Sequence, residues 1–234
     1  RVLQVSASLG VTFYPQGEEV DADQLLRQAD QAMYQAKLSG KNRCHVFDKE
    51  LDHLLRGRHE GLERIRLAMA REEFELVYQP RVNMRTGQVV GAEALIRWRH
   101  PERGLLAPEV FLPVLQGHSQ SILLGEWVLD TALSQIEAWK DAGLRFSVSV
   151  NIDALQLQQP DFVSRLRAQL AAHPGVTVGD LELEVLETSA LEDIAQASRV
   201  MLACRDLGID FALDNFGAGY SSLTYLRRLP VRQL

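Results

Sequence analysis

The sequence predicts an α/β fold in which a largely parallel β-sheet is covered by helices. Three observations support this class: strands and helices alternate along the chain, the strands are apolar, and acidic or amide side chains recur near the ends of successive strands. Apolar strands separated by helices are typical of parallel sheets, because the crossover helices bury both faces. Two closures fit this alternation, an open doubly wound sheet or a (β/α)₈ barrel.

Residues 1–48 have the pattern of a βαβ-like unit. The predicted elements are a strand over 5–13, a helix that ends near 38, and a closing strand over 43–47. Asp21 or Asp23 is expected to cap this helix, and Gly40 to end it. So short a unit buries little core, which indicates the tail of a larger domain.

Residues 49–70 are predicted to form a linking helix. Its apolar positions lie close to a seven-residue repeat: Leu51, Leu55, Leu62, Ile65 and Met69. A parallel coiled coil, which would imply a homodimer, produces such a repeat. An amphipathic helix packed on its own domain also produces it, and the interruption at Arg58 favours this second interpretation.

Residues 71–234 carry the alternating pattern. The predicted strands are Phe74–Gln79, Val89–Trp98, Phe146–Asn151, Leu181–Glu187 and Phe211–Phe216. The predicted helices lie near 108–116, 120–142, 160–172 and 190–207, and Gly208 is expected to end the last one. The segment 230–234 resembles the approach to a further strand, so a barrel would be incomplete in this chain.

Composition excludes several classes of protein. The formal charge is −6 and hydrophobic residues make up 46% of the 234 residues, as in an ordinary soluble globular protein. The acidic balance argues against bulk nucleic acid as a partner, because that function usually needs a basic surface. No apolar run approaches the length of a membrane span, so we expect a cytoplasmic segment without membrane contact. Cys44 and Cys204 are expected to be reduced core residues.

Oxygen-bearing side chains recur on successive predicted strands, within the second strand and near the carboxyl ends of the later ones. They are Glu93, Asn151, Glu184 with Glu187, and Asp214 with Asn215. Ligands bind at this edge of parallel α/β sheets, so these side chains are expected to converge there. Mg²⁺ and Mn²⁺ prefer such ligands, and a buried group of carboxylates without a cation would repel itself.

Arg97 suggests the chemistry of the substrate. It follows Glu93 by four residues on the same strand, so both side chains face the same way. An arginine there could bind a phosphate in a bidentate manner, or it could form a salt bridge with a neighbouring acid. Metal-binding acids beside an arginine fit phosphodiester hydrolysis.

The segment Gly91-Ala-Glu-Ala-Leu-Ile-Arg-Trp-Arg-His-Pro101 resembles the signature of EAL domains. The resemblance covers about residues 59–234 and continues through several motifs in the expected order: Tyr78-Gln79-Pro80, Asn151, Glu184–Glu187, Asp214–Ser222 and Tyr225–Pro230. It implies a (β/α)₈ barrel that hydrolyses cyclic di-GMP to pGpG. Residues 1–48 are similar to the C-terminal end of a GGDEF domain, so 71–234 would form most of an EAL domain.

The resemblance also implies roles for individual residues. Glu93, Asn151, Glu184 and Asp214 would hold the first metal ion, Mg²⁺ or Mn²⁺. Glu187 would brace the loop after the fifth strand, and the dinucleotide would contact Gln79, Leu95 and Arg97.

Asn215 departs from the family pattern, which usually has a second Asp there for a second metal ion. An amide removes one negative charge, and ligand charge sets much of the affinity for a hard cation. The catalytic Lys of the family is expected directly after Leu234. The chain is therefore interpreted either as a phosphodiesterase or as a catalytically weak cyclic di-GMP receptor. A scaffold that binds no nucleotide is the third class, and it would not need the four metal-binding residues.

Overall fold

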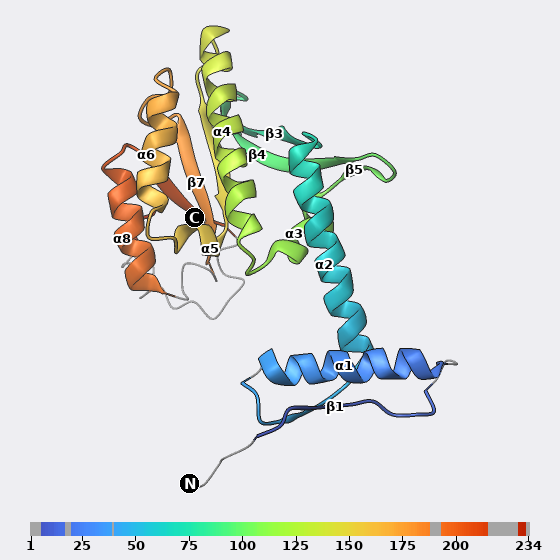
Figure 1. Cartoon of the computed structure of the whole chain (residues 1–234). Helices are drawn as coiled ribbons and strands as arrows, with labels where there is room; N and C mark the ends of the chain where they lie inside the picture. The colour runs from blue at the N-terminus through green and yellow to red at the C-terminus, as the bar shows by residue number, and fades with distance from the viewer. Residues whose placement is uncertain (1–5, 17–19, 39, 188–192, 215–228, 233–234) are drawn as a thin grey trace. The chain divides into compact units, whose positions relative to one another are not determined.

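A computed structural model describes residues 6–16, 20–38, 40–187, 193–214 and 229–232 of the chain (Figure 1). The chain divides into two units, Arg1–Glu60 and Gly61–Leu234. No described helix combines the length and the apolar character that a membrane span requires.

The first unit contains a βαβ arrangement, as the sequence predicts. Strand β1 (Leu9–Val11) and strand β2 (Cys44–Val46) pair in parallel, and helix α1 (Ala22–Leu38) connects them. The Asp21 carboxylate accepts a hydrogen bond from the Gln24 backbone N–H at 2.7 Å, so Asp21 is the residue that caps α1. Both strands are shorter than predicted.

The two cysteines lie in different environments. Cys204 is buried in helix α8 (Ile194–Arg205), where burial raises the pKa of its thiol to about 12. Cys44 is exposed, so its assignment to the core is wrong. The physical reason is local, because a short two-stranded sheet leaves the first residue of β2 with little chain to cover it.

Helix α2 (Lys49–Ala70) is continuous, and its C-terminal half packs into the second unit's own core. Ile65 is buried against Phe74, Trp98 and Phe111, and Leu62 and Met69 pack beside it. This supports the packed-helix interpretation for the half of α2 whose side chains are described. The side chains of Leu51 and Leu55 lie outside the described residues.

The second unit is built on a mixed β-sheet. Its strands are β3 (Phe74–Val82), β4 (Val89–His100), β5 (Gly104–Leu106), β6 (Ser147–Ile152), β7 (Leu181–Leu186) and β8 (Asp210–Asp214). The order is β3-β4-β6-β7-β8, with β5 also paired to β4. Strands β4, β6, β7 and β8 are parallel, as predicted.

Two strands differ from the predicted parallel arrangement. Strands β3 and β5 both pair antiparallel to β4. The connections are too short for a crossover, which needs a dozen or more residues, so the chain must turn back. Among the described residues the sheet does not close. The Arg232 N–H donates to the Phe211 carbonyl at 2.8 Å, so the last described segment runs beside β8.

Helices follow the strands and cover one face of this sheet (Figure 1). They are α3 (Pro108–Leu115), α4 (Gln120–Asp141), α5 (Ala154–Leu157), α6 (Phe162–Ala172) and α8. Four of them lie where the sequence predicts helices, whereas α5 and strand β5 were not predicted. Gly208, with a φ of +84°, follows α8 in the left-handed conformation expected of a terminating glycine.

The main core lies between the sheet and these helices. Alternate strand residues point into it and are almost fully buried: Val148 and Val150 of β6, Leu181, Leu183 and Val185 of β7, and Phe211 and Leu213 of β8. Because strand side chains alternate, the intervening residues lie on the opposite face of the same strands.

Candidate functional site

The face of the sheet opposite the helices is polar. Its residues come from five strands: Gln79, Arg81, Glu93, Ser147, Ser149, Asn151, Glu182, Glu184, Asp210 and Asp214. The register aligns them across the sheet, since Gln79 pairs with Glu93, Glu93 with Ser149, and Asn151 with Glu184. A face with so many charged groups can bind a polar ligand or a cation.

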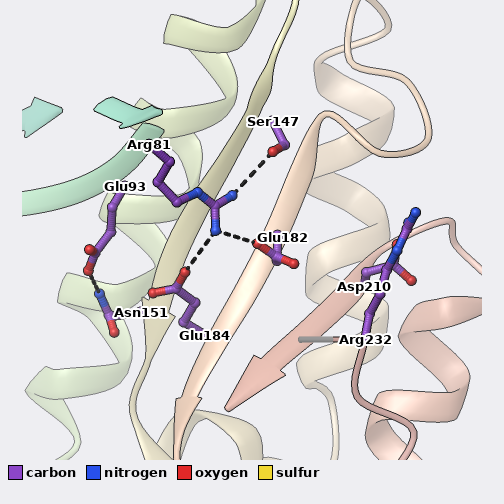
Figure 2. A network of polar contacts seen from close by, with 8 residues as sticks. All are labelled: Arg81, Glu93, Ser147, Asn151, Glu182, Glu184, Asp210 and Arg232. Carbon is purple, nitrogen blue, oxygen red and sulfur yellow. Dashed lines mark hydrogen bonds and ion pairs between the residues drawn. The ribbon is translucent and has the colours of Figure 1, made fainter. Parts of the chain in front are cut away.

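Glu93 and Asn151 are in direct contact at one edge of this polar face (Figure 2). The Asn151 Nδ2 donates to the Glu93 Oε1 at 2.8 Å. Asn151 is the register partner of Glu184 on the next strand. Three of the predicted metal ligands therefore occupy neighbouring strands on one face.

Arg81 reaches this polar face from β3, and the sequence did not single it out (Figure 2). Its Nη1 lies 2.9 Å from Glu182 Oε2 and 3.4 Å from Glu184 Oε1. Its Nη2 donates to the Ser147 hydroxyl at 3.2 Å. A sequence signal for these residues exists, because strand side chains alternate with a period of two. This period places Arg81 on the same face as Gln79, and Glu182 on the same face as Glu184.

The electrostatics around Glu184 favour a cation. Burial raises the pKa of the Glu184 carboxyl, and the negative charges of Glu93 and Glu182 raise it further. The nearby Ser149 hydroxyl and the charge of Arg81 act in the opposite direction. Carboxylates that repel one another in a buried setting are stabilised by a divalent cation, so the donor set fits Mg²⁺ or Mn²⁺.

The side chains are not gathered into a metal cage. Among the described residues, no three His, Cys, Asp or Glu side chains are close enough together to hold a metal ion. Glu93 is turned toward Asn151 and Glu184 toward Arg81, as mutual repulsion between carboxylates would favour. The structure thus brings the strands together, while the acids make hydrogen bonds to protein groups.

The other predicted ligands lie further along the same edge. Asp214 is the last residue of β8, half-buried, and pairs in register with Leu186. Asn215 lies outside the described residues. Glu187 follows β7 directly and is buried. The loop that Glu187 would brace falls within 215–228, also outside the described residues.

The residues predicted to contact a dinucleotide lie on β3 and β4. Gln79, Leu95 and Arg97 share the polar face with Glu93. Gln79 is the register partner of Glu93, and Leu95 and Arg97 follow Glu93 at intervals of two residues on the same strand. The Arg97 Nη1 donates to the Ile96 carbonyl at 2.9 Å. Glu75, opposite Arg97, forms an ion pair with Arg99.

Two family models match the chain. The EAL domain model matches residues 62–234, and the model of the diguanylate cyclase GGDEF domain matches residues 1–43. The chain belongs to the EAL domain family. This confirms the resemblance drawn from the motifs around Glu93, Asn151 and Glu184.

Relatives of this EAL domain include two proteins of Pseudomonas aeruginosa. The chain is 38% identical over 234 residues to the bifunctional diguanylate cyclase/cyclic di-GMP phosphodiesterase MucR, covering 99% of this chain and 34% of that protein. It is 37% identical to the cyclic di-GMP phosphodiesterase NbdA, covering 100% of this chain and 30% of that protein. The chain thus spans about a third of the length of these curated relatives.

Solved structures show the same fold. The PaMucR phosphodiesterase in complex with c-di-GMP superposes with a TM-score of 0.70 at 38% identity, covering 74% of this chain and 70% of that one. The EAL enzyme Bd1971, with cAMP and cyclic di-GMP bound, gives 0.71 at 28% identity, covering 91% and 56%. The chain is therefore an EAL domain homologous to cyclic di-GMP phosphodiesterases.

Proposed function

We propose that this EAL domain binds cyclic di-GMP and hydrolyses it to linear pGpG with the help of Mg²⁺ or Mn²⁺. The observation that carries the proposal is the polar face on which Glu93, Asn151 and Glu184 occupy adjacent strands, with Asn151 hydrogen-bonded to Glu93 and in register with Glu184. Family membership and homology to phosphodiesterases support the same activity.

Each site residue has a role in this proposal. The first metal ion would be held by Glu93, Asn151, Glu184 and Asp214, and a second, more weakly, with the help of Asn215. A bound metal would activate water and stabilise the leaving oxygen. Gln79, Leu95 and Arg97 would bind the dinucleotide, and Glu187 would brace the loop after β8.

The proposal includes an arrangement of the whole chain. Residues 1–48 would be the end of a GGDEF domain, 49–70 a linking helix, and 71–234 part of the EAL domain. We further propose that the protein acts in the cytoplasm, and that a homodimer would form if α2 pairs with a second copy.

Release of pGpG by the full-length protein tests the proposal. We expect turnover with Mn²⁺ or Mg²⁺, none in excess EDTA, and a loss of at least ~100-fold in Glu93→Gln, or about 2.7 kcal/mol of transition-state stabilisation. Arg99→Met is the matched control, since Arg99 lies on the same strand but pairs with Glu75. Unchanged turnover in Glu93→Gln would reject this metal site.

A second candidate function is a non-catalytic cyclic di-GMP receptor. Asn215 favours it, because a neutral amide binds a second metal ion more weakly than a carboxylate. Tight binding of cyclic di-GMP by calorimetry, with no pGpG at saturating Mn²⁺, would support the receptor. Turnover at low Mg²⁺ would exclude it.

A further inference from the structure

We propose that Arg81 is a positioning residue for Glu184, with the buried Glu182 as its anchor. This inference rests on the proposed function, because it concerns the orientation of a predicted metal ligand. It assigns a role to Arg81 and Glu182, which lie outside the sequence motifs, and to Gly91, which begins the EAL-like segment.

The strand order and register of the sheet determine the path of the Arg81 side chain. Arg81 starts on β3, whereas Glu182 and Glu184 lie on β7, with β4 and β6 between them. In register, Arg81 is opposite Gly91, and Gly91 is opposite Ser147. The guanidinium therefore crosses the two intervening strands over their smallest side chains.

Gly91 leaves room for this crossing. A Cβ atom at Gly91 would lie 2.9 Å from Arg81 Nε, 3.0 Å from Arg81 Nη2 and 3.1 Å from the Ser147 carbonyl oxygen. The first distance is too short for a real contact and the other two are tight, so an added Cβ would displace the flexible guanidinium from its place beside Ser147. A glycine inside a strand often marks such a close approach, and here the approaching group is the Arg81 side chain.

Glu182 fixes the guanidinium in place. Its side chain is 7% exposed, against 13% for Glu184 and 30% for Arg81. A carboxylate this deeply buried needs a paired cation, and Arg81 Nη1 supplies one at 2.9 Å. The planar guanidinium holds several donors in one geometry, so anchoring on Glu182 also sets the donor that meets Glu184 Oε1.

The pair can be removed without changing the charge of the polar face. Arg81 carries one positive charge and Glu182 one negative charge, so a double variant that neutralises both has the same sum. Any loss of metal affinity in that variant then occurs at unchanged net charge, which favours a change in the orientation of Glu184 as its cause. This separates positioning from electrostatic repulsion.

The experiment measures Mn²⁺ binding to the full-length protein by electron paramagnetic resonance of the free ion. Partners that orient metal ligands contribute about 10–100-fold in affinity, so we expect roughly tenfold weaker binding in the double variant Arg81→Met/Glu182→Gln. Arg81→Lys should restore part of the loss seen in Arg81→Met. Gly91→Ala, which leaves every charged group present, should also weaken Mn²⁺ binding.

Leu183→Val is the matched control for stability. Leu183 lies between Glu182 and Glu184 but faces the helices, so this variant loosens β7 from its other side. Its Mn²⁺ affinity should stay within about twofold of wild type. An equal loss in Leu183→Val and in the double variant would overturn the positioning role.

Wild-type affinity in the double variant would overturn the inference, while the proposed metal site would stand. If the double variant does not fold, Gly91→Ala decides, and wild-type affinity there has the same meaning. If the wild-type protein bound neither Mn²⁺ nor cyclic di-GMP, the proposed function itself would be rejected.

Discussion

The two faces of the same strands have different roles in this EAL domain: one packs against the helices, and the other carries the charged residues of the candidate site. On β7, Leu181, Leu183 and Val185 are buried against helices, whereas Glu182 and Glu184 point to the polar face and share Arg81. The apolar face stabilises the fold through burial, at about 25 cal/mol per Å². The polar face keeps charges close together and gains little stability from them. Mutations at residues one position apart should therefore change the free energy of unfolding by very different amounts.

Truncation of neighbouring residues on opposite faces of β7 tests this difference in stability most directly. Leu183→Ala should lower the free energy of unfolding by about 3 kcal/mol, since it opens a cavity in the core. Glu184→Ala should change it by less than about 1 kcal/mol, because Arg81 keeps Glu182 as a partner and a repelling carboxylate is gone. Urea unfolding of both variants measures the difference, and equal losses would contradict it.

Arg97 tests whether the polar face binds the nucleotide. Arg97→Ala should weaken cyclic di-GMP binding by about 1.5–3 kcal/mol, the scale of a lost charged hydrogen bond. Calorimetry measures the affinity, and Arg99→Ala, two residues along the same strand, is the control that should bind normally. Unchanged affinity in Arg97→Ala would remove the phosphate-binding role.

A substitution at Asn215 tests whether the domain acts as an enzyme or as a receptor. Asn215→Asp should raise the rate of pGpG release roughly tenfold, or about 1.4 kcal/mol, because a carboxylate holds a second metal ion more strongly than an amide. The gain should be largest at low Mg²⁺, and Mn²⁺ should partly restore the wild-type rate. Equal, fast rates of both proteins at low Mg²⁺ would show that Asn215 is no handicap.

The smallest effect is expected at His173, which follows helix α6 and contacts helix α4. Its Nδ1 lies 2.9 Å from Glu137 and its Nε2 3.1 Å from Asp130. The hydrogen bond to Glu137 raises the pKa of His173, partial burial opposes this, and Asp130 adds to the rise. Because the folded state favours the protonated imidazole, the stabilisation is complete below the unfolded pKa of about 6.5 and is lost as pH rises through the folded value.

The free energy of unfolding should thus fall by about 0.5–1 kcal/mol across that window, the scale of an ion pair close to the surface. His173→Gln should abolish this part of the pH dependence, whereas His59→Gln, at an exposed position of α2, should retain it. Urea unfolding between pH 5.5 and 8.5 measures both, at values chosen to bracket the usual pKa of histidine. An identical slope in His173→Gln would contradict the assignment.

Much of the architecture follows from local patterns in the sequence. The helix over Gln120–Asp141 and the strand over Leu181–Leu186 lie close to the predicted ranges, because apolar spacing reports directly on a helix or strand face. Strand β5 and helix α5 were missed because so few residues carry no periodic signal. Strand β3 was predicted, but its antiparallel direction was missed, because direction depends on the connection and the apolar pattern does not reveal it.

The sequence by itself determined the family, the acidic and amide residues of the site, and their places on successive strands. These are local properties, since motif spacing and the period of two need no knowledge of distant chain segments. Only the tertiary structure decided that Asn151 contacts Glu93 and that Arg81 crosses over Gly91 to reach Glu182 and Glu184. Those contacts join residues roughly 60–100 positions apart, and they depend on strand order and register, which arise from packing of the whole sheet.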